Sequence, residues 1–257
     1  MKLFNLLLKS SPESLIWESK VSGVIVQVWE KEDRRELRFG NHIMQSVISK
    51  IRPDMLVLPY SRFMLLGLLF CPEPKSVLHI GLGGGSIVRW MHREFPELQQ
   101  TVIEINSAVI EAAHSYFDLP RDKRLRVLCA DAAEMIPTLT DKFDLIILDA
   151  FGDYGPPEEL TRIEFLHKLR GCLHDDSWLV GNLWTVTGDF KERREQWKST
   201  FNQVLGARAN RKGNVILYGS RLSQLPEKQQ FEATAKILQK RHQIDFRKML
   251  RELHAVT

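Results

Sequence analysis

The chain has 257 residues, of which 44% are hydrophobic and 26% are charged, and its formal net charge at pH 7 is +4. This length and composition are typical of one large globular domain, alone or with a small appendage. The longest apolar stretches fall short of the roughly 20 residues that a membrane-spanning helix needs, so we expect no membrane association.

The cysteines and the distribution of charge further limit the kind of protein that this chain can be. Cys71, Cys129 and Cys172 are odd in number and widely spaced. We therefore expect no disulfide framework and no bound metal, and we expect reduced thiols in a cytoplasmic protein. Lys and Arg are concentrated at 191–194 and 236–251. We interpret these runs as solvated helix faces and not as a nucleic-acid-binding surface.

The first part of the chain carries short alternating or β-branched runs. Residues 21–30 alternate apolar and polar side chains and predict a half-buried strand, while residues 35–39 and 43–48 are weaker candidates. Residues 1–8 are expected to form a strand or helix that packs onto the fold. The sequence thus predicts a small β-rich unit over residues 1–55 and a second domain over residues 56–257.

The pattern changes at residue 56. Residues 56–70 predict a buried helix with Pro59 in its first turn, and strands and helices alternate after it. The predicted strands are 76–80, 100–105, 126–130, 143–148, 178–183 and 214–218. The predicted helices are 87–95, 107–117, a short one from 132, one to about 173 with a capping box at Thr161 and Glu164, and the tail from 226. The alternation indicates an α/β fold, a mostly parallel, doubly wound sheet with helices on both faces.

A glycine-rich loop is the strongest sign of a ligand. Its sequence, H-I-G-L-G-G-G-S at residues 79–86, follows a predicted strand and opens a predicted helix. Glycines allow positive φ and a close approach to a ligand, and the helix start offers free N–H groups. We therefore expect Gly81, Gly83, Gly84 and Gly85 to form a binding loop.

Three acidic residues follow successive predicted strands. Glu104 ends the strand after the loop, where open α/β sheets place an acid on ribose hydroxyls, although an exposed strand-end Glu is the alternative. Asp131 ends the third strand and suits an adenine amine, or alternatively caps the helix that follows. Asp149 ends the fourth strand. With the G-x-G-x-G spacing, these acids favour a nucleoside-methionine ligand such as S-adenosylmethionine over a dinucleotide.

The run from about residue 35 to 220 resembles the spermidine synthase (polyamine aminopropyltransferase) family. Its most specific element, D-A-F-G-D-Y-G-P-P-E-E-L from Asp149, aligns without gaps to the family's D-S-S-D-P-x-G-P-A-E-x-L. The other matching positions are Gln45 in I-M-Q-S, Tyr60 in L-P-Y-S-R, the loop 81–86, Glu104 in V-I-E-I-N, Asp131 with Ala132, and the late strand 213–217.

The resemblance implies a methyltransferase-like Rossmann fold with an N-terminal β unit, a role in polyamine biosynthesis, and a homodimer. The donor substrate would be S-adenosylmethionine or its decarboxylated form, and the acceptor an amine. Asp149 and Asp153 would be catalytic, and Tyr60 would contact the substrate. The donor would be bound by Gln45, Gly81, Gly83, Gly84, Gly85, Glu104, Asp131 and Ala132.

The positions at which the sequence departs from the family are ones that the resemblance would assign to the reaction. The acid of the family's glycine-rich loop is Gly84 here, and the fourth residue of D-S-S-D is Gly152, with Asp153 one place later. The family's Tyr-(His/Gln)-Glu ends in Arg62. Carboxylates hold ammonium groups and accept protons, so these changes weaken the expected amine site.

Three hypotheses therefore remain open from the sequence. The favoured one is aminopropyl transfer with Asp153 substituting for the missing acid. The others are methyl transfer from S-adenosylmethionine and a non-catalytic protein that binds the nucleoside. His79, beside the glycines, is expected to be a packed, hydrogen-bonded histidine and not a base.

Overall fold

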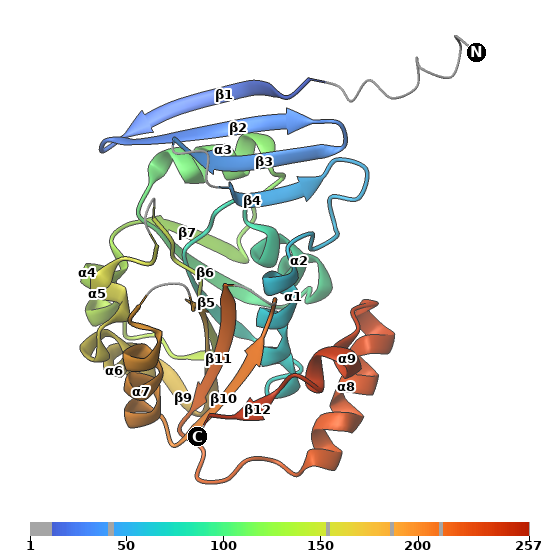
Figure 1. The fold of residues 1–257 in the computed structure, drawn as a ribbon, viewed down its shortest axis with the longest axis vertical. Helices are drawn as coiled ribbons and strands as arrows, with labels where there is room; N and C mark the ends of the chain where they lie inside the picture. The colour runs from blue at the N-terminus through green and yellow to red at the C-terminus, as the bar shows by residue number, and fades with distance from the viewer. Residues whose placement is uncertain (1–11, 41–43, 153–154, 186–187, 211–212, 257) are drawn as a thin grey trace.

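The computed structural model describes residues 12–40, 44–152, 155–185, 188–210 and 213–256. Its first four strands form an antiparallel sheet in the order β1-β2-β3-β4, drawn in blue in Figure 1. Their bounds are β1 (Ser14–Val21), β2 (Val24–Lys31), β3 (Arg34–Phe39) and β4 (Met44–Ser49). A β-rich N-terminal unit is therefore present, while the element predicted at residues 1–8 lies outside the described residues.

The strand predicted over residues 21–30 is wrong at its start. Ser22 and Gly23 have φ values of +51° and +86° and reverse the chain between β1 and β2. Two consecutive residues with positive φ form the tight turn that matches the twist of a hairpin. The alternating pattern therefore spans the end of one strand and most of the next.

The second sheet has eight strands in the order β12-β10-β11-β9-β8-β5-β6-β7. The pairings from β7 to β9 are parallel and the remaining three are antiparallel, so the expected mostly parallel sheet is confirmed. The bounds are β5 (Ser76–Ile80), β6 (Gln99–Glu104), β7 (Leu125–Cys129), β8 (Phe143–Leu148), β9 (Leu173–Trp184), β10 (Gln203–Arg208), β11 (Asn214–Ser220) and β12 (His254–Ala255).

Helices cover both faces of this sheet (Figure 1). Leu145 and Ile147 of β8 pack in one apolar core with α1, α2, α8 and α9, while Ile146 between them packs in a second core with α6 and α7. The helices are α1 (Pro59–Met64), η2 (Leu65–Leu69), α2 (Ser86–Glu94), α3 (Ser107–Tyr116), α4 (Ala132–Met135), η3 (Ile136–Thr138), α5 (Glu158–Thr161), α6 (Ile163–Gly171), α7 (Phe190–Thr200), α8 (Lys228–His242) and α9 (Phe246–Leu250). Within the described ranges, none of them is both long and apolar enough to cross a membrane.

Two helix predictions need correction. The helix predicted over residues 56–70 begins only at Pro59, because proline disfavours the helical conformation of the residue before it, and Leu58 is extended with ψ of 128°. The predicted capping box does not form: Thr161 ends α5, and its hydroxyl donates to the Glu158 carbonyl. Helix α6 starts two residues later, after Arg162, without a side-chain cap.

The N-terminal sheet packs on α3, which lies directly beneath it in Figure 1. Val26, Val28 and Leu37 share an apolar core with Val109 and Ala112 of the helix. This contact holds β4 against the carboxyl ends of the main sheet's strands. A boundary between independent units at residue 55 stays a prediction.

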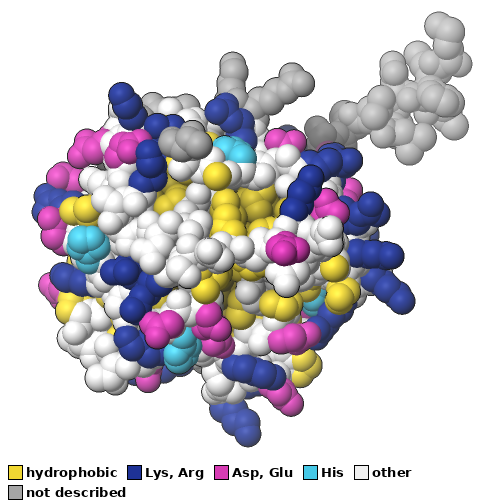
Figure 2. Space-filling model, turned by 90° about the horizontal axis from the view of Figure 1, so that it is seen from below, with side chains coloured by type: hydrophobic (Ala, Val, Ile, Leu, Met, Phe, Trp, Pro, Cys, Tyr) yellow, Lys and Arg dark blue, Asp and Glu magenta, His cyan; other side chains and the backbone are white. Residues whose placement is uncertain are grey.

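The basic residues at the start of α7 have acidic partners. On α7, Arg193 pairs with Asp189, and Arg194 and Lys198 both pair with Glu195 at 3.1 Å. Figure 2 shows the same mixture on the face seen from below, where Lys and Arg around the rim alternate with Asp and Glu. The interpretation of both runs as solvated helix faces stays a prediction, and Arg193 departs from it with a side chain that is 11% exposed.

Candidate active site

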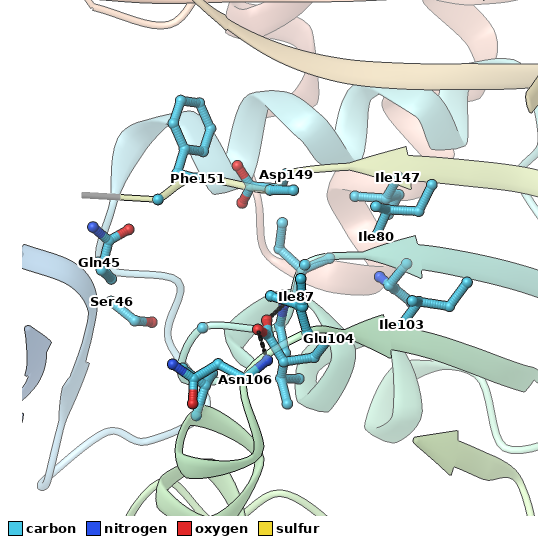
Figure 3. Close-up of a pocket in the computed structure, with 18 of the residues that line it drawn as sticks. Gln45, Ser46, Ile80, Ile87, Ile103, Glu104, Asn106, Ile147, Asp149 and Phe151 are labelled. Atoms are coloured by element: carbon cyan, nitrogen blue, oxygen red, sulfur yellow. Dashed lines mark hydrogen bonds between the residues drawn. The ribbon is translucent and has the colours of Figure 1, made fainter. Parts of the chain in front are cut away.

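A cavity of about 380 Å³ lies at the carboxyl ends of β5, β6, β7 and β8. Open α/β sheets bind ligands at this edge, because the strand ends and the loops after them converge there. Figure 3 shows Gln45 and Ser46 of β4 opposite the strand ends that carry Glu104 and Asp149. The cavity is therefore closed on one side by the N-terminal sheet.

The glycine-rich loop forms the base of this cavity, and Gly81 is the position where a side chain fits least. Its φ is +90°, and a Cβ atom there would lie 2.3 Å from the carbonyl oxygen of Asp149. Its N–H donates to the Ile103 carbonyl at 2.9 Å. Gly83 also has a positive φ and lines the cavity, and Gly85 caps α2 with a φ of +68°.

At Gly84 it is the lack of space for a side chain, and not a positive φ, that requires glycine. A Cβ atom there would lie 2.8 Å from Ser46 Oγ and 2.9 Å from Phe117 Cδ1. Strand β4 and the end of α3 therefore fill the space that a side chain at this position would need. Gly84 itself does not line the cavity, so it supports the loop from behind.

We expect Gly84→Asp, which restores the acid of the family's loop, to lower the free energy of unfolding by about 1–3 kcal/mol through overpacking against Ser46 and Phe117. Chemical denaturation measures this change. Adding Ser46→Gly removes one of the two clashes and should recover part of the loss. Equal stability of Gly84→Asp and the parent chain would contradict the packing argument.

Glu104 is held in a fixed orientation at the end of β6. Its Oε2 accepts from the Leu82 N–H at 3.0 Å, and its Oε1 accepts from the Asn106 N–H at 2.9 Å. Burial raises the pKa of this carboxyl, and the backbone hydrogen bonds oppose that shift. Each oxygen keeps a further lone pair, so the carboxylate can still accept two hydroxyl groups from a ligand.

Asp131 forms the helix cap that the sequence left open for it and also faces the cavity, while its role toward an adenine amine stays a prediction. Its Oδ1 accepts from the Ala133 N–H at 2.7 Å and caps α4. The same residue lines the cavity beside Ala132. Because the cap uses one carboxylate oxygen, the other can accept a hydrogen bond from a ligand amine.

Asp149 is a second acid of the cavity whose pKa is raised. Its Oδ1 accepts from the Asn182 Nδ2 at 2.9 Å, and the Tyr60 hydroxyl donates to the same carboxylate. Burial nevertheless raises the pKa of Asp149 to about 6. Burial and this carboxylate also raise the pKa of Tyr60 well above its ordinary value, so the phenol keeps its proton.

Asn182 is a site residue that the sequence analysis missed. It lies in the apolar run W-L-V-G-N-L-W of β9, and its exposed fraction is 7%. A lone amide inside such a run is a detectable signal, since a buried amide must find partners. Its partner could not be predicted, because it depends on β9 pairing beside β8.

The histidine beside the loop is packed and hydrogen-bonded, as the sequence predicted. His79 is 2% exposed, and its Nε2 lies 2.9 Å from Gln100 Oε1. Burial lowers the pKa of His79 to about 4. Across the described residues, no group of three or more His, Cys, Asp or Glu is placed to hold a metal ion.

The second predicted catalytic acid, Asp153, lies outside the described residues. The positions that flank its segment are close together: the Gly152 N–H donates to the Gly155 carbonyl at 2.8 Å. Phe151 stacks near Trp184 with ring centroids 5.0 Å apart. On either side of this segment, Phe151 and Gly152 before it and Pro157 after it line the cavity.

Comparison with known proteins identifies related chains. The model of the spermine/spermidine synthase domain matches residues 60–205. A polyamine aminopropyltransferase of Neisseria meningitidis serogroup A is 32% identical over 236 residues, which cover 90% of this chain and 89% of the relative.

Solved structures extend the comparison to the fold. A probable spermidine synthase from Corynebacterium glutamicum superposes with a TM-score of 0.74 at 20% identity, covering 87% of this chain and 86% of that one. Human methyltransferase-like protein 13, solved in complex with SAH, superposes with a TM-score of 0.68 at 23% identity, covering 72% and 92%. At these identities the two structures show the fold alone, which is methyltransferase-like, as predicted.

Proposed function

Since the chain belongs to the spermine/spermidine synthase family, we propose that it transfers an aminopropyl group from a nucleoside sulfonium donor to an amine. The observation that carries the proposal is Asp149, a half-buried carboxylate with a pKa of about 6 that accepts hydrogen bonds from Tyr60 and Asn182 in the cavity. A general base works best when its pKa lies near the operating pH.

We propose that the donor is decarboxylated S-adenosylmethionine, bound by the residues that the sequence singled out. The free oxygen of Asp131 accepts the adenine amine, with Ala132 beside the base. Glu104 accepts the ribose hydroxyls. The sulfonium arm then lies over Gly81 and Gly83, with Gln45 opposite, while Gly84 and Gly85 fix the shape of the loop.

The reaction is a direct displacement. The lone pair of the acceptor nitrogen forms a bond to the carbon beside the sulfonium, the carbon–sulfur bond breaks, and its electrons neutralise the sulfur to give a thioether nucleoside. The nitrogen loses one proton, which Asp149 accepts. Catalysis thus rests on alignment of the two substrates and on removal of that proton. Tyr60 orients the carboxylate and contacts the acceptor.

Methyl transfer from S-adenosylmethionine is the second candidate. The arm of the decarboxylated donor carries an ammonium group and no carboxylate. Gly84 favours methyl transfer, because the loop then has no carboxylate at this position to attract such an arm. An assay with both donors and a set of polyamines separates the candidates by mass spectrometry. Methylthioadenosine supports aminopropyl transfer, and S-adenosylhomocysteine supports methyl transfer. Tight nucleoside binding without formation of either product would support the hypothesis of a non-catalytic binding protein.

The pH dependence of transfer follows from Asp149. Because only its ionised form accepts a proton, kcat/KM should fall about tenfold per pH unit below about 6. The raised pKa also means that the folded chain binds this proton more tightly than the unfolded chain, so its ionisation lowers stability as pH rises from 3.8 to about 6. Initial rates between pH 4.5 and 8, with circular dichroism as a folding control, test the profile. A flat profile through pH 6 would exclude Asp149 as the base.

Glu104→Gln should weaken binding of both donors and of methylthioadenosine by at least about tenfold. In the wild-type chain the carboxylate accepts hydrogen bonds from two backbone N–H groups. The new NH2 group must face one of these N–H groups, so one of the two hydrogen bonds is lost. The ribose loses a hydrogen-bond acceptor at the same time. Calorimetric titration measures the three affinities. Glu97→Gln, at a side chain that is 82% exposed, is the matched control. Unchanged affinity for methylthioadenosine would remove Glu104 from the proposed site.

We also propose a cytoplasmic homodimer that binds no nucleic acid. Cys71, Cys129 and Cys172 are free thiols, which suits a reducing compartment. Leu15 and Ile16 of the edge strand β1 are 43% and 37% exposed, and a second copy can cover such an edge. Sedimentation equilibrium tests the dimer, and a monomer at micromolar concentration would exclude it.

A further inference from the structure

A row of amide side chains runs from Asp149 to the protein surface. Asn182 Nδ2 donates to Asp149 Oδ1 at 2.9 Å, and Asn214 Nδ2 donates to Asn182 Oδ1 at 2.9 Å. Asn210 Nδ2 donates to Asn214 Oδ1 at 3.0 Å. The row crosses from β8 to β9 and β11 and ends at the exposed Asn210. Each link is a hydrogen bond of ordinary length.

The direction of these bonds is fixed at the surface end. The oxygen and nitrogen of a single amide are hard to tell apart, so each orientation has to be deduced from its partners. The backbone N–H of Asn214 can only donate, and it faces Asn210 Oδ1 at 3.1 Å. Asn210 must therefore present its NH2 to Asn214, which presents its own NH2 to Asn182. The last NH2, that of Asn182, then points at the carboxylate.

This direction matters because an NH2 group stabilises an ionised carboxylate and a carbonyl oxygen does not. If the Asn182 amide turned over, its oxygen would face the oxygen of Asp149, and the carboxylate would have to bind a proton. We propose that Asn214 is a positioning residue that, through Asn182, holds Asp149 in its proton-accepting form. The inference rests on the proposed role of Asp149 as the base.

The other groups around Asp149 do not replace this contact. Within the part of the chain that the structure describes, its side-chain hydrogen-bond partners are Asn182 of β9 and Tyr60 of α1. The remaining titratable side chains that line the cavity are His79 of β5, Glu104 of β6, Asp131 after β7 and Glu159 of α5. His79 is neutral at physiological pH, and none of the others is a cation that could stabilise the carboxylate.

Two substitutions test the row. Asn214→Asp keeps the shape but presents an oxygen to Asn182, so the Asn182 amide should turn over. Asn182→Leu removes the donor outright. We expect each to move the acid limb of the pH profile of kcat/KM upward by about one pH unit, which lowers the rate at pH 5 about tenfold. Asn202→Asp adds the same charge at an exposed amide outside the row and should leave the limb in place.

A second measurement does not depend on turnover. In protein with 13C-labelled aspartate, the carboxyl signal that disappears in Asp149→Asn can be titrated in each variant. The same upward shift is expected there, even if no amine is ever found to accept an aminopropyl group. Thermal unfolding shows whether each variant is folded. A shift in Asn182→Leu with none in Asn214→Asp would overturn the role of Asn214, and no shift in either would overturn the whole row.

Discussion

We expect Asp149→Asn to lower kcat for aminopropyl transfer by about 10²–10⁴-fold and to leave donor affinity nearly unchanged. The amide has the size of the carboxylate but cannot take the proton that the acceptor nitrogen releases. In the proposed site the donor is bound by Glu104, Asp131 and the loop, and the substitution changes none of these residues. Single-turnover rates and calorimetric titration of the donor measure the two quantities separately.

The control for this substitution is Asp141→Asn, an exposed position before β8, which should keep the parent rate. Asp153→Asn gives the decisive comparison, because the alignment left Asp153 as the other candidate base. Loss of rate in Asp153→Asn with normal rate in Asp149→Asn would transfer the proton-accepting role to Asp153. Loss in both would indicate that the two acids act together.

Gly81→Ala should lower the free energy of unfolding by about 3–5 kcal/mol. The left-handed φ of +90° strains any other residue, and the new methyl group would lie 2.3 Å from the backbone oxygen of Asp149, which cannot rotate away. Such a loss is a large part of the 5–15 kcal/mol that stabilises most proteins. Urea denaturation measures it.

Gly171→Ala is the matched control, since a methyl group at the end of α6 meets no atom within 4 Å. We expect its stability to lie within about 1 kcal/mol of the parent chain, because Ala is the better helix former. A loss below 1 kcal/mol in Gly81→Ala as well would mean that β8 can retreat from the loop.

The sequence predicted the fold best where several local patterns pointed to the same element. The apolar runs of β5 and β8, with glycines after the first and an acid after the second, placed both the strands and the cavity edge. Strands β10 and β12 were not predicted. Gly206 interrupts the pattern of the first, and the second has two residues, so both depend on pairing with neighbours that are distant in the chain.

The candidate site shows the same division. Glu104 and Asp131 could be found because strand ends of a parallel sheet meet at one edge. The link between Asn182 and Asp149 could not, since it depends on which strands become neighbours. The steric need for glycine at position 84 could not be predicted from the sequence either, because Ser46, which fills the space, comes from a different sheet. The capping box did not form because Thr161 is the last residue of α5 and the next helix begins only at Ile163, so Thr161 is not at its N-cap.

The close approach of Gly81 to Asp149 has a consequence for the order of events. The Asp149 N–H donates to the Ile80 carbonyl at 2.9 Å, so the proposed donor loop and the strand end that carries the proposed base are in backbone contact. We therefore expect a shift of one to be passed on to the other. A bound donor that immobilises the loop therefore also immobilises Asp149 before any amine arrives. Steady-state kinetics should then follow a compulsory sequence, with the nucleoside entering first and leaving last.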